Sequence, residues 1–479
     1  MSVGASEGPM FEGIDPDQGE WLIEHCINNV ASWQFLRRAR RPSLPKNVSV
    51  RPLRGGMTNA MYVLEDTSGS VVPSSHQRVV ARLLAHEVDG LIDREREDEI
   101  RRIVAEAGLT PRTLGSVGKD AAGSGNPPVR FEAFVPGRTL ECVDLHVGVV
   151  LHSMARRFAS LHRLKVSHRT ADLGDARHLQ RLLRRFSSYG DPLLGKEGWD
   201  TAKMISSWLA VRDAVCGPVE SWEAALCHMD AQEGNWIWEG EDGQEGKEDS
   251  DAKDDDALRL STFRGSGMQE DAAGNVSAGA GAHALCTGLM SRSTSSSIDS
   301  SLTEVATGDS SEDVPLVLID WEYAGVSHPA FDIGNLWCEA AIDYSCDTSP
   351  GFCLRPRWFP RLQVCRAFIR TYLQCRFGSS EKVEVDETMV EKWLSMSQVQ
   401  VMGSHLLWGL WAFAMHHQRV QPSVESFDEF GFDYLAYGNT RLRLFEASMH
   451  EWDHEAGRAT GKGGFGQVRD AGVPPGAQC

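Results

Sequence analysis

The hydrophobic repeat of this chain changes once, near residue 138, and this change limits the fold more than any other feature. Before it, five segments have the character of β-strands: NVSVRPL, AMYVLED, QRVVARLLA, TPRTLGSVG and PVRFEAFV. One amphipathic helical segment, LIDREREDEIRRIVAEAGL, stands between the third and the fourth. After residue 138 most segments have the period of helices. The order predicts an α+β protein, with a small sheet and one helix at 47–138 and a mostly helical part at 139–452.

Three segments lie outside this scheme. Residues 1–46 are expected to form a helical or loose extension, and residues 453–479 a flexible tail. The third segment, 239–313, carries 17 acidic and 5 basic residues and is rich in serine, glycine and alanine. Because it is poor in aromatic residues, it cannot bury enough apolar surface to become ordered. We therefore expect a disordered acidic insertion between two short strands, NWIW and PLVLID.

The composition argues against several classes of protein. A formal net charge of −19 does not suit a nucleic-acid binder that neutralises phosphates. No apolar run approaches the ~18 residues of a membrane span, and the first residues lack the basic and apolar regions of a secretory signal. The eleven cysteines contain no C-x-x-C pair, which indicates reduced thiols. We expect a cytoplasmic protein without a nucleic-acid partner.

The segment CHMDAQEGNWIW has the spacing H-x-D-x-x-x-x-N, formed by His228, Asp230 and Asn235. Phosphoryl transfer from a nucleotide needs a carboxylate beside the acceptor hydroxyl and hard oxygen ligands for Mg²⁺. Asp230 and Asn235 have the chemistry for these two roles. Taken alone, the spacing fits a polar turn equally well. The apolar run before the segment and the strand after it favour a catalytic loop.

A further acid stands in VLIDWEYAG, where Asp320 follows a four-residue apolar run. An acid at the end of a strand can reach a metal without burying its charge unpaired. An ordinary aspartate between a strand and a turn would look the same. Because Asp230 and Asn235 precede it in the order found in kinases, we favour the interpretation of Asp320 as a second Mg²⁺ ligand.

The N-terminal part holds two features that suit phosphate groups. Gly55 and Gly56 lie between two strands, where exposed backbone N–H groups could meet phosphate oxygens, although a plain hairpin turn fits too. Arg82 is central on an otherwise apolar strand, so its charge needs a partner. Glu97 on the following helix is the candidate. The alternative is that Arg82 reaches the strand edge and that Glu97 is one charge among many.

Aromatic residues and acids gather farther along the chain. Glu322 and Tyr323 follow Asp320 closely, and Trp408 and Trp411 lie three residues apart on one helical face. Aromatic faces beside a carboxylate suit an ammonium group. From spacing alone, however, the two tryptophans fit a protein core better.

Together these stretches resemble the choline/ethanolamine kinase family, a branch of the protein-kinase-like fold. The resemblance spans about residues 47 to 450. The H-x-D-x-x-x-x-N spacing is shared by the wider superfamily, whereas DWEYA with FDIGN and SHLLWGLW is more specific. The resemblance implies two lobes: a nucleotide-binding N-lobe with an antiparallel sheet and one helix, and a mostly helical C-lobe with the catalytic loop and an amine pocket. It rests on RGGMTNAMYVL, RVVARLL with DREREDEIRRI, FEAFVPGRTL, CHMDAQEGNWIW, LIDWEYAGVSHPAFDIGNLWCEAAIDY, SHLLWGLW and FDYLAYGNTRL.

The resemblance also implies residue roles. Asp230 would be the base, Asn235 and Asp320 would hold Mg²⁺, and Arg82 and Glu97 would form the pair that grips the phosphates. Asp332 would brace the catalytic loop, while we expect His162 to be structural. The ATP phosphates would lie against Arg54, Gly55, Gly56, Met57, Thr58, Asn59, Ala60 and Gln232, the adenine against Ala133, Phe134 and Val135, and the ammonium group against Glu322, Tyr323, Tyr344, Trp408, Trp411 and Tyr437.

The activity that the resemblance implies is ATP- and Mg²⁺-dependent phosphorylation of choline to phosphocholine, the first step toward phosphatidylcholine. Ethanolamine, or both amines, is the alternative. Trp321 stands where the family usually has Phe, and Met229 where it often has Asn. Such departures bear on substrate preference rather than on activity. An idle scaffold and an aminoglycoside kinase fit the sequence less well. Since family members often form dimers, a homodimer is one expectation.

Overall fold

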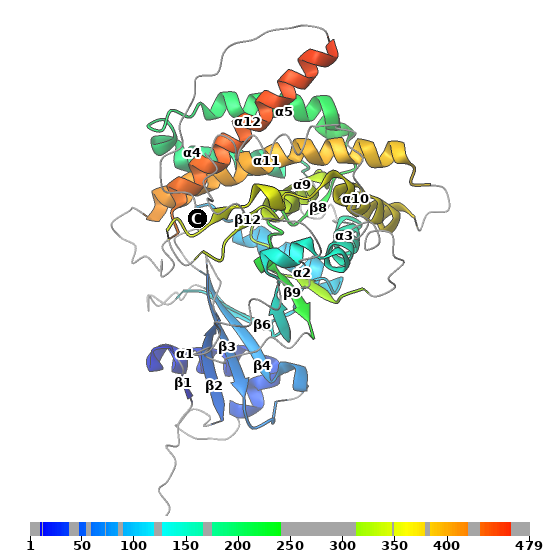
Figure 1. Ribbon diagram of the computed structural model, residues 1–479. Coiled ribbons are helices and arrows are strands. Elements are labelled where there is room, and N and C mark those ends of the chain that lie inside the picture. The colour runs from blue at the N-terminus through cyan, green and yellow to red at the C-terminus, as the bar shows by residue number, and fades with distance from the viewer. Residues whose placement is uncertain are drawn as a thin grey trace, which may run out of the picture.

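The computed structural model has two lobes, with a β-sheet lobe at one end of the molecule and a larger helical lobe at the other (Figure 1). This arrangement confirms the predicted α+β architecture. The structure describes residues 10–11, 13–37, 47–53, 59–71, 73–84, 90–118, 127–165, 175–240, 313–346, 349–378, 384–419 and 432–460.

The N-lobe contains a six-stranded sheet with the order β1-β2-β3-β4-β6-β5. The first pair, β1 and β2, is parallel, and the other neighbours are antiparallel. The five predicted strands are confirmed, and β1 is an addition from the N-terminal segment. The strands are β1 (Met10–Phe11), β2 (Val48–Leu53), β3 (Asn59–Asp66), β4 (Arg78–Leu84), β5 (Thr113–Val117) and β6 (Val129–Ala133).

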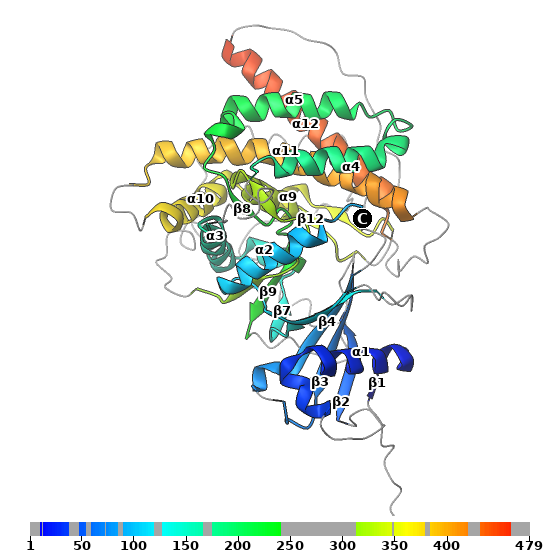
Figure 2. The ribbon, with the colours of Figure 1, turned by 180° about the vertical axis from the view of Figure 1, so that it is seen from behind.

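One face of this sheet is covered by helix α1 (Pro16–Asn29), which crosses it in Figure 2. Its Leu22 and Ile23 share a buried core with Ala81 of β4 and Phe131 of β6. The described part of residues 1–46 is largely helical, as one form of the expected extension, and its helix α1 is built into the N-lobe core. Because side chains alternate along a strand, Arg82 lies on the opposite face of β4 from Ala81.

Helix α2 (Arg94–Glu106) packs between the two lobes. Asp93 caps it by accepting a hydrogen bond from the backbone N–H of Arg96. Its Ile100 and Val104 are fully buried in the core of the C-lobe, while Glu97 belongs to its first turn. The helix therefore holds its first-turn acids beside the junction of the lobes.

The C-lobe is mostly helical, as predicted, with α11 in contact with α4, α5, α9, α10 and α12. The last helix continues to Thr460, so the predicted tail begins too early, and residues 461–479 lie outside the described part. None of the helices in the described ranges has the length and apolar character needed to cross a membrane. The helices are α3 (Gly148–His162), α4 (His178–Leu194), α5 (Thr201–Cys216), α9 (Ala330–Glu339), α10 (Leu362–Phe377), α11 (Glu387–Arg419) and α12 (Tyr434–Thr460).

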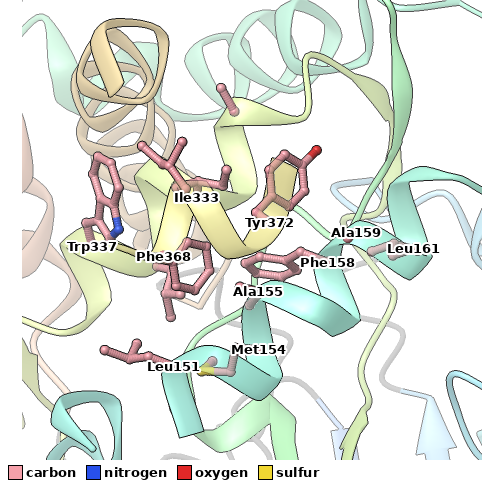
Figure 3. Packing of buried hydrophobic residues seen from close by; sticks show 14 of the residues in the cluster. Leu151, Met154, Ala155, Phe158, Ala159, Leu161, Ile333, Trp337, Phe368 and Tyr372 are labelled. Atoms are coloured by element: carbon pink, nitrogen blue, oxygen red, sulfur yellow. The ribbon is translucent and has the colours of Figure 1, made fainter. Parts of the chain in front are cut away.

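The C-lobe core brings α3, α9 and α10 together. In Figure 3, Phe158 of α3 faces Phe368 and Tyr372 of α10, with Ile333 of α9 beside them. Burying such a side chain stabilises the fold by about 1.5–3 kcal/mol. Gly334 lets α9 approach α11 closely, because a Cβ there would lie 2.7 Å from the backbone oxygen of Ser397. This packing fixes α9, which carries several polar side chains of the site.

Short strands flank the residues predicted to be catalytic. The strands β8 and β11 pair antiparallel, and β9 pairs with both β7 and β10. The predicted hairpin of NWIW and PLVLID is confirmed, and residues 241–312 between its strands lie outside the described part of the chain. The pairing brings Asp320 near the loop after β8. The strands are β7 (Gly137–Thr139), β8 (Ala225–Cys227), β9 (Trp236–Glu239), β10 (Leu316–Leu318), β11 (Gly325–Ser327), β12 (Ile342–Asp343) and β13 (Cys353–Leu354).

Candidate active site

The predicted catalytic loop, which begins at His228, is braced by Asp332 of α9. The two carboxylate oxygens of Asp332 accept the backbone N–H groups of His228, at 2.8 Å, and of Met229, at 2.9 Å. Buried His162 lies 3.1 Å from the same carboxylate. These bonds hold Met229 at φ 73°, a strained conformation for a residue other than glycine. The predicted bracing role of Asp332 and the structural role of His162 are thus confirmed.

Asp230 and Asn235 lie within hydrogen-bond distance of each other. The amide nitrogen of Asn235 donates to the backbone oxygen of Asp230 at 2.7 Å and to its carboxylate at 3.1 Å. The amide oxygen is thereby left to other partners. The ring of His228 and the backbone oxygen of Asn235 bond with the backbone of Ile319 at 2.8 and 2.9 Å. Since Ile319 precedes Asp320, these bonds bring Asp320 to the same site as Asp230 and Asn235.

Asp320 forms an ion pair with Arg82 of the N-lobe sheet. Its carboxylate accepts a hydrogen bond from Nη1 of Arg82 at 3.1 Å, and Nε of Arg82 lies 3.7 Å from Glu132. Asp320 has φ 68°, the second strained residue of the site. Arg82 is almost fully buried, so these carboxylates compensate its charge. Arg82 of β4 therefore contacts Asp320, the acid predicted to bind Mg²⁺.

The predicted pairing of Arg82 with Glu97 was wrong. Glu97 instead accepts from Arg130 at 2.6 Å and from Arg94 at 2.8 Å. The reason is the register of the sheet, because Arg130 stands directly opposite Arg82 on β6 and also faces α2. Sequence reasoning missed Arg130, although it stands in PVRFEAFV much as Arg82 stands in RVVARLLA.

Glu97 supports a prediction about stability. Burial would raise the pKa of its carboxyl, but Arg130 and Arg94 outweigh burial and lower it from 4.5 to about 2. Such a group stabilises the folded state above pH 4.5 and loses its contribution as pH falls toward 2. The lowering corresponds to about 3 kcal/mol. We expect Glu97→Gln to reduce the free energy of unfolding by about this amount at pH 7, as measured by urea denaturation.

The control for this prediction is Glu99→Gln, which removes a partly exposed acid that pairs with the exposed Arg102 on the same helix. We expect a change of less than about 1 kcal/mol for this variant. The deficit of Glu97→Gln should narrow between pH 4.5 and pH 3. A deficit that is the same at pH 7 and pH 3 would contradict the ionic origin of the stabilisation.

The predicted ATP contacts are described only in part. Arg54, Gly55, Gly56, Met57 and Thr58 lie outside the described residues. Asn59 begins β3 and is buried, and Ala60 follows it in the same strand. Gln232 is half-buried in the catalytic loop. Of the residues predicted to line the adenine, Phe134 has the guanidinium of Arg78 over its ring at 4.2 Å, Val135 follows it, and the backbone N–H of Ala133 already donates to the backbone oxygen of Arg112.

The predicted amine rings form one continuous group. Trp408 is in edge-on contact with Tyr323 and Trp411, with ring centres 5.3 and 5.5 Å apart. Tyr437 lies 6.5 Å from Trp411 and 6.2 Å from Tyr344. These residues come from α11, α12, the segment after Asp320 and the end of β12. The structure therefore brings together all five rings that the family resemblance assigns to an ammonium pocket.

The carboxylate beside these rings is Glu339 rather than Glu322. Glu339 accepts from the hydroxyl of Tyr344 at 2.7 Å and from Arg441 at 3.0 Å. Glu322 instead contacts the N-lobe, where it accepts from Asn59 at 3.2 Å. Sequence reasoning missed Glu339. Its spacing of seven residues from Asp332, two turns along α9, was the available signal.

The site holds more negative than positive charge around Asp230. Burial raises the pKa of Asp230 well above its usual value, and the charges of Glu339, Asp320 and Glu322 raise it further. Burial and Asp320 also raise the pKa of Glu322, to about 8. A divalent cation would relieve this repulsion. The carboxylate of Asp320 and the amide oxygen of Asn235 are the hard oxygen ligands that Mg²⁺ prefers, so the residues fit that ion.

The braced loop and the acid paired with an arginine of the N-lobe sheet fit a kinase with the protein-kinase-like fold. A family model described as choline/ethanolamine kinase matches residues 50–446. The protein therefore belongs to the choline/ethanolamine kinase family.

Known proteins agree with this assignment. The choline/ethanolamine kinase of Rattus norvegicus is 22% identical, over 86% of this chain and 83% of its own. The probable choline kinase 2 of Arabidopsis thaliana is 24% identical, over 85% and 89%. The crystal structure of choline kinase from Cryptosporidium parvum has a TM-score of 0.59 and 17% identity, and the match covers 91% of this chain and 97% of that chain. The family model shows the family, and the structural likeness shows the fold.

Proposed function

We propose that this protein uses ATP and Mg²⁺ to phosphorylate the hydroxyl group of choline, giving phosphocholine. The observation that carries the proposal is the continuous group of five rings, two of which lie within electrostatic reach of Asp230. Burial raises the pKa of Tyr323 and of Tyr437, and the charge of Asp230 raises both further, which supports a position of these two rings near the loop acid. An ammonium group held against the rings would present the hydroxyl of a short amino alcohol to Asp230.

Choline is favoured over ethanolamine because the polar ends of the rings are already occupied. Nε1 of Trp411 donates to the hydroxyl of Tyr323 at 2.8 Å, and the hydroxyls of Tyr344 and Tyr437 lie 2.9 Å apart. Nε1 of Trp408 donates to a buried asparagine oxygen at 2.8 Å. The group of five rings therefore offers mainly aromatic faces to a ligand. A quaternary ammonium has no N–H to donate, so it is suited to such faces.

Ethanolamine is the second candidate, and Glu339 is the observation that favours it. A primary ammonium needs oxygen acceptors, and Glu339 lies beside Tyr344 with both carboxylate oxygens facing polar groups. Those oxygens are already engaged by a hydroxyl and a guanidinium. We therefore rank ethanolamine below choline.

In the proposed mechanism, Asp230 accepts the proton of the choline hydroxyl. The choline oxygen forms a bond to the γ-phosphorus while the bond from that phosphorus to the β–γ bridging oxygen breaks, and ADP leaves. The raised pKa of Asp230 suits a base, because it gives the carboxylate a greater affinity for the proton. Arg82 would contact the phosphates. Asn235 and Asp320 would hold Mg²⁺, which neutralises phosphate charge when bound.

A comparison of amines tests the proposed substrate. We expect kcat/KM to rise through ethanolamine, monomethylethanolamine, dimethylethanolamine and choline, with choline about tenfold above ethanolamine, since aromatic faces discriminate by roughly 1–2 kcal/mol. A coupled assay of ADP release measures all four. Equal or higher kcat/KM for ethanolamine would make the second candidate the function.

A further inference from the structure

Arg94, the first residue of α2, joins three parts of the molecule. Its Nη1 donates to Glu97 at 2.8 Å and lies 3.5 Å from a carboxylate oxygen of Glu322. Its Nη2 donates to the side-chain oxygen of Asn59 at 3.2 Å. The amide nitrogen of Asn59 in turn donates to Glu322 at 3.2 Å. These four side chains form a connected network that links α2 and β3 of the N-lobe to the C-lobe.

The network lies next to residues that the proposed function assigns to ATP and Mg²⁺. Asn59 is the first residue of β3 and belongs to the stretch that the family resemblance assigns to the ATP phosphates. Glu322 stands two residues after Asp320. The network therefore connects the start of β3 with the segment that carries a proposed metal ligand.

Charge makes Arg94 important for this connection. The side chains of Glu97 and Glu322 are 2% and 4% exposed, so water screens them little. The negative charge of Glu97 acts unfavourably on Glu322. Arg94 stands between these two buried acids and pairs with both. Without it, Glu97 would lose one of its two arginine partners and Glu322 would lose its contact with α2, inside a region where buried polar groups need partners.

We propose that Arg94 is a positioning residue that holds the two lobes at the separation needed to grip a nucleotide. Its contacts with Asn59 and Glu322 hold the start of β3 beside the segment that carries Asp320. This inference rests on the proposed function, because it assumes that ATP lies between the lobes. It gives Glu322 a role between the lobes in place of the ammonium contact expected from the sequence.

This role affects the two substrates differently. The ring group and Glu339 belong entirely to C-lobe elements. A nucleotide in the proposed place touches both lobes. Loss of Arg94 should therefore weaken ATP binding while the affinity for the amine remains unchanged. A general loss of structure would weaken both.

The test compares Arg94→Gln with Arg102→Gln. Arg102 is on the same helix but pairs with Glu99 and Glu106 on the surface. We expect Arg94→Gln to raise KM for ATP at least tenfold with KM for choline within twofold, and Arg102→Gln to change neither. Arg94→Lys should give an intermediate KM for ATP, because lysine keeps the charge but lacks the fork that reaches three partners.

Two measurements keep the test independent of the reaction. Direct titration with ATP should show the same loss of affinity in Arg94→Gln, even if the amine substrate has been assigned wrongly. Small-angle X-ray scattering should show a larger radius of gyration for this variant without nucleotide. If it does not fold, the double variant Arg94→Gln/Glu322→Gln removes both charges and should fold, again with weakened ATP binding. Unchanged ATP affinity, or equal losses for ATP and choline, would overturn the proposal.

Discussion

Replacing Asp230 by asparagine should lower kcat for choline phosphorylation by roughly 10²- to 10⁴-fold, the contribution expected of a general base. Asparagine has nearly the same shape but cannot take up the hydroxyl proton. Its side-chain oxygen can still accept the hydrogen bond from Asn235, which is 3.1 Å long in the structure. The loop itself is held by Asp332 through the backbone of His228 and Met229, so its path should persist.

The same substitution should leave stability unchanged or raise it. In the folded protein, burial and the charges of Glu339 and Asp320 disfavour the ionised form of Asp230. Removing the charge relieves this repulsion, as expected at a site where function opposes stability. Kinetic assays and thermal unfolding of Asp230→Asn, beside the control Asp191→Asn at an exposed position of α4, measure both effects. Activity within threefold of wild type would show that Asp230 is not the base.

Much of the site could be predicted because it is encoded in short stretches. His228, Asp230 and Asn235 share one loop, and its position between an apolar run and a strand is visible in the sequence. Asp320 follows strand β10 closely, and the hairpin of β9 and β10 carries it to that loop. Local patterns specify such strands and turns directly.

The pairing of charges could not be predicted in the same way. The segment DREREDEIRR offers several acids and arginines, and only the register of β4 and β6 makes Arg130 the partner of Glu97. Likewise, Glu322 follows Asp320 closely in the sequence, yet its side chain contacts Asn59 of the N-lobe. Ion pairs between distant segments depend on the docking of whole elements, which no local pattern records.

Asp320 is expected to set the Mg²⁺ requirement of the reaction. Under the proposed mechanism, Asp320→Asn removes a charged Mg²⁺ ligand, so activity should need far more Mg²⁺. Loss of a residue that merely supports a ligand typically costs 10–100-fold in metal affinity, and we expect at least this shift here, with kcat reduced as well. Asparagine is the right substitution, because Asp320 has φ 68° and asparagine tolerates this left-handed conformation better than alanine.

The fold should survive Asp320→Asn, because Arg82 keeps a second partner in Glu132, 3.7 Å from its Nε. Titration of activity against free Mg²⁺ measures the expected shift, and Asp175→Asn, which removes an acid that pairs with Arg181 on the surface, is the control. Loss of a metal ligand predicts partial recovery at high Mg²⁺. If Asp320 served only to orient Arg82, added Mg²⁺ would not restore activity, and KM for ATP would rise equally at every Mg²⁺ concentration. That second pattern would remove Asp320 from the metal site and leave it as the C-lobe partner of Arg82.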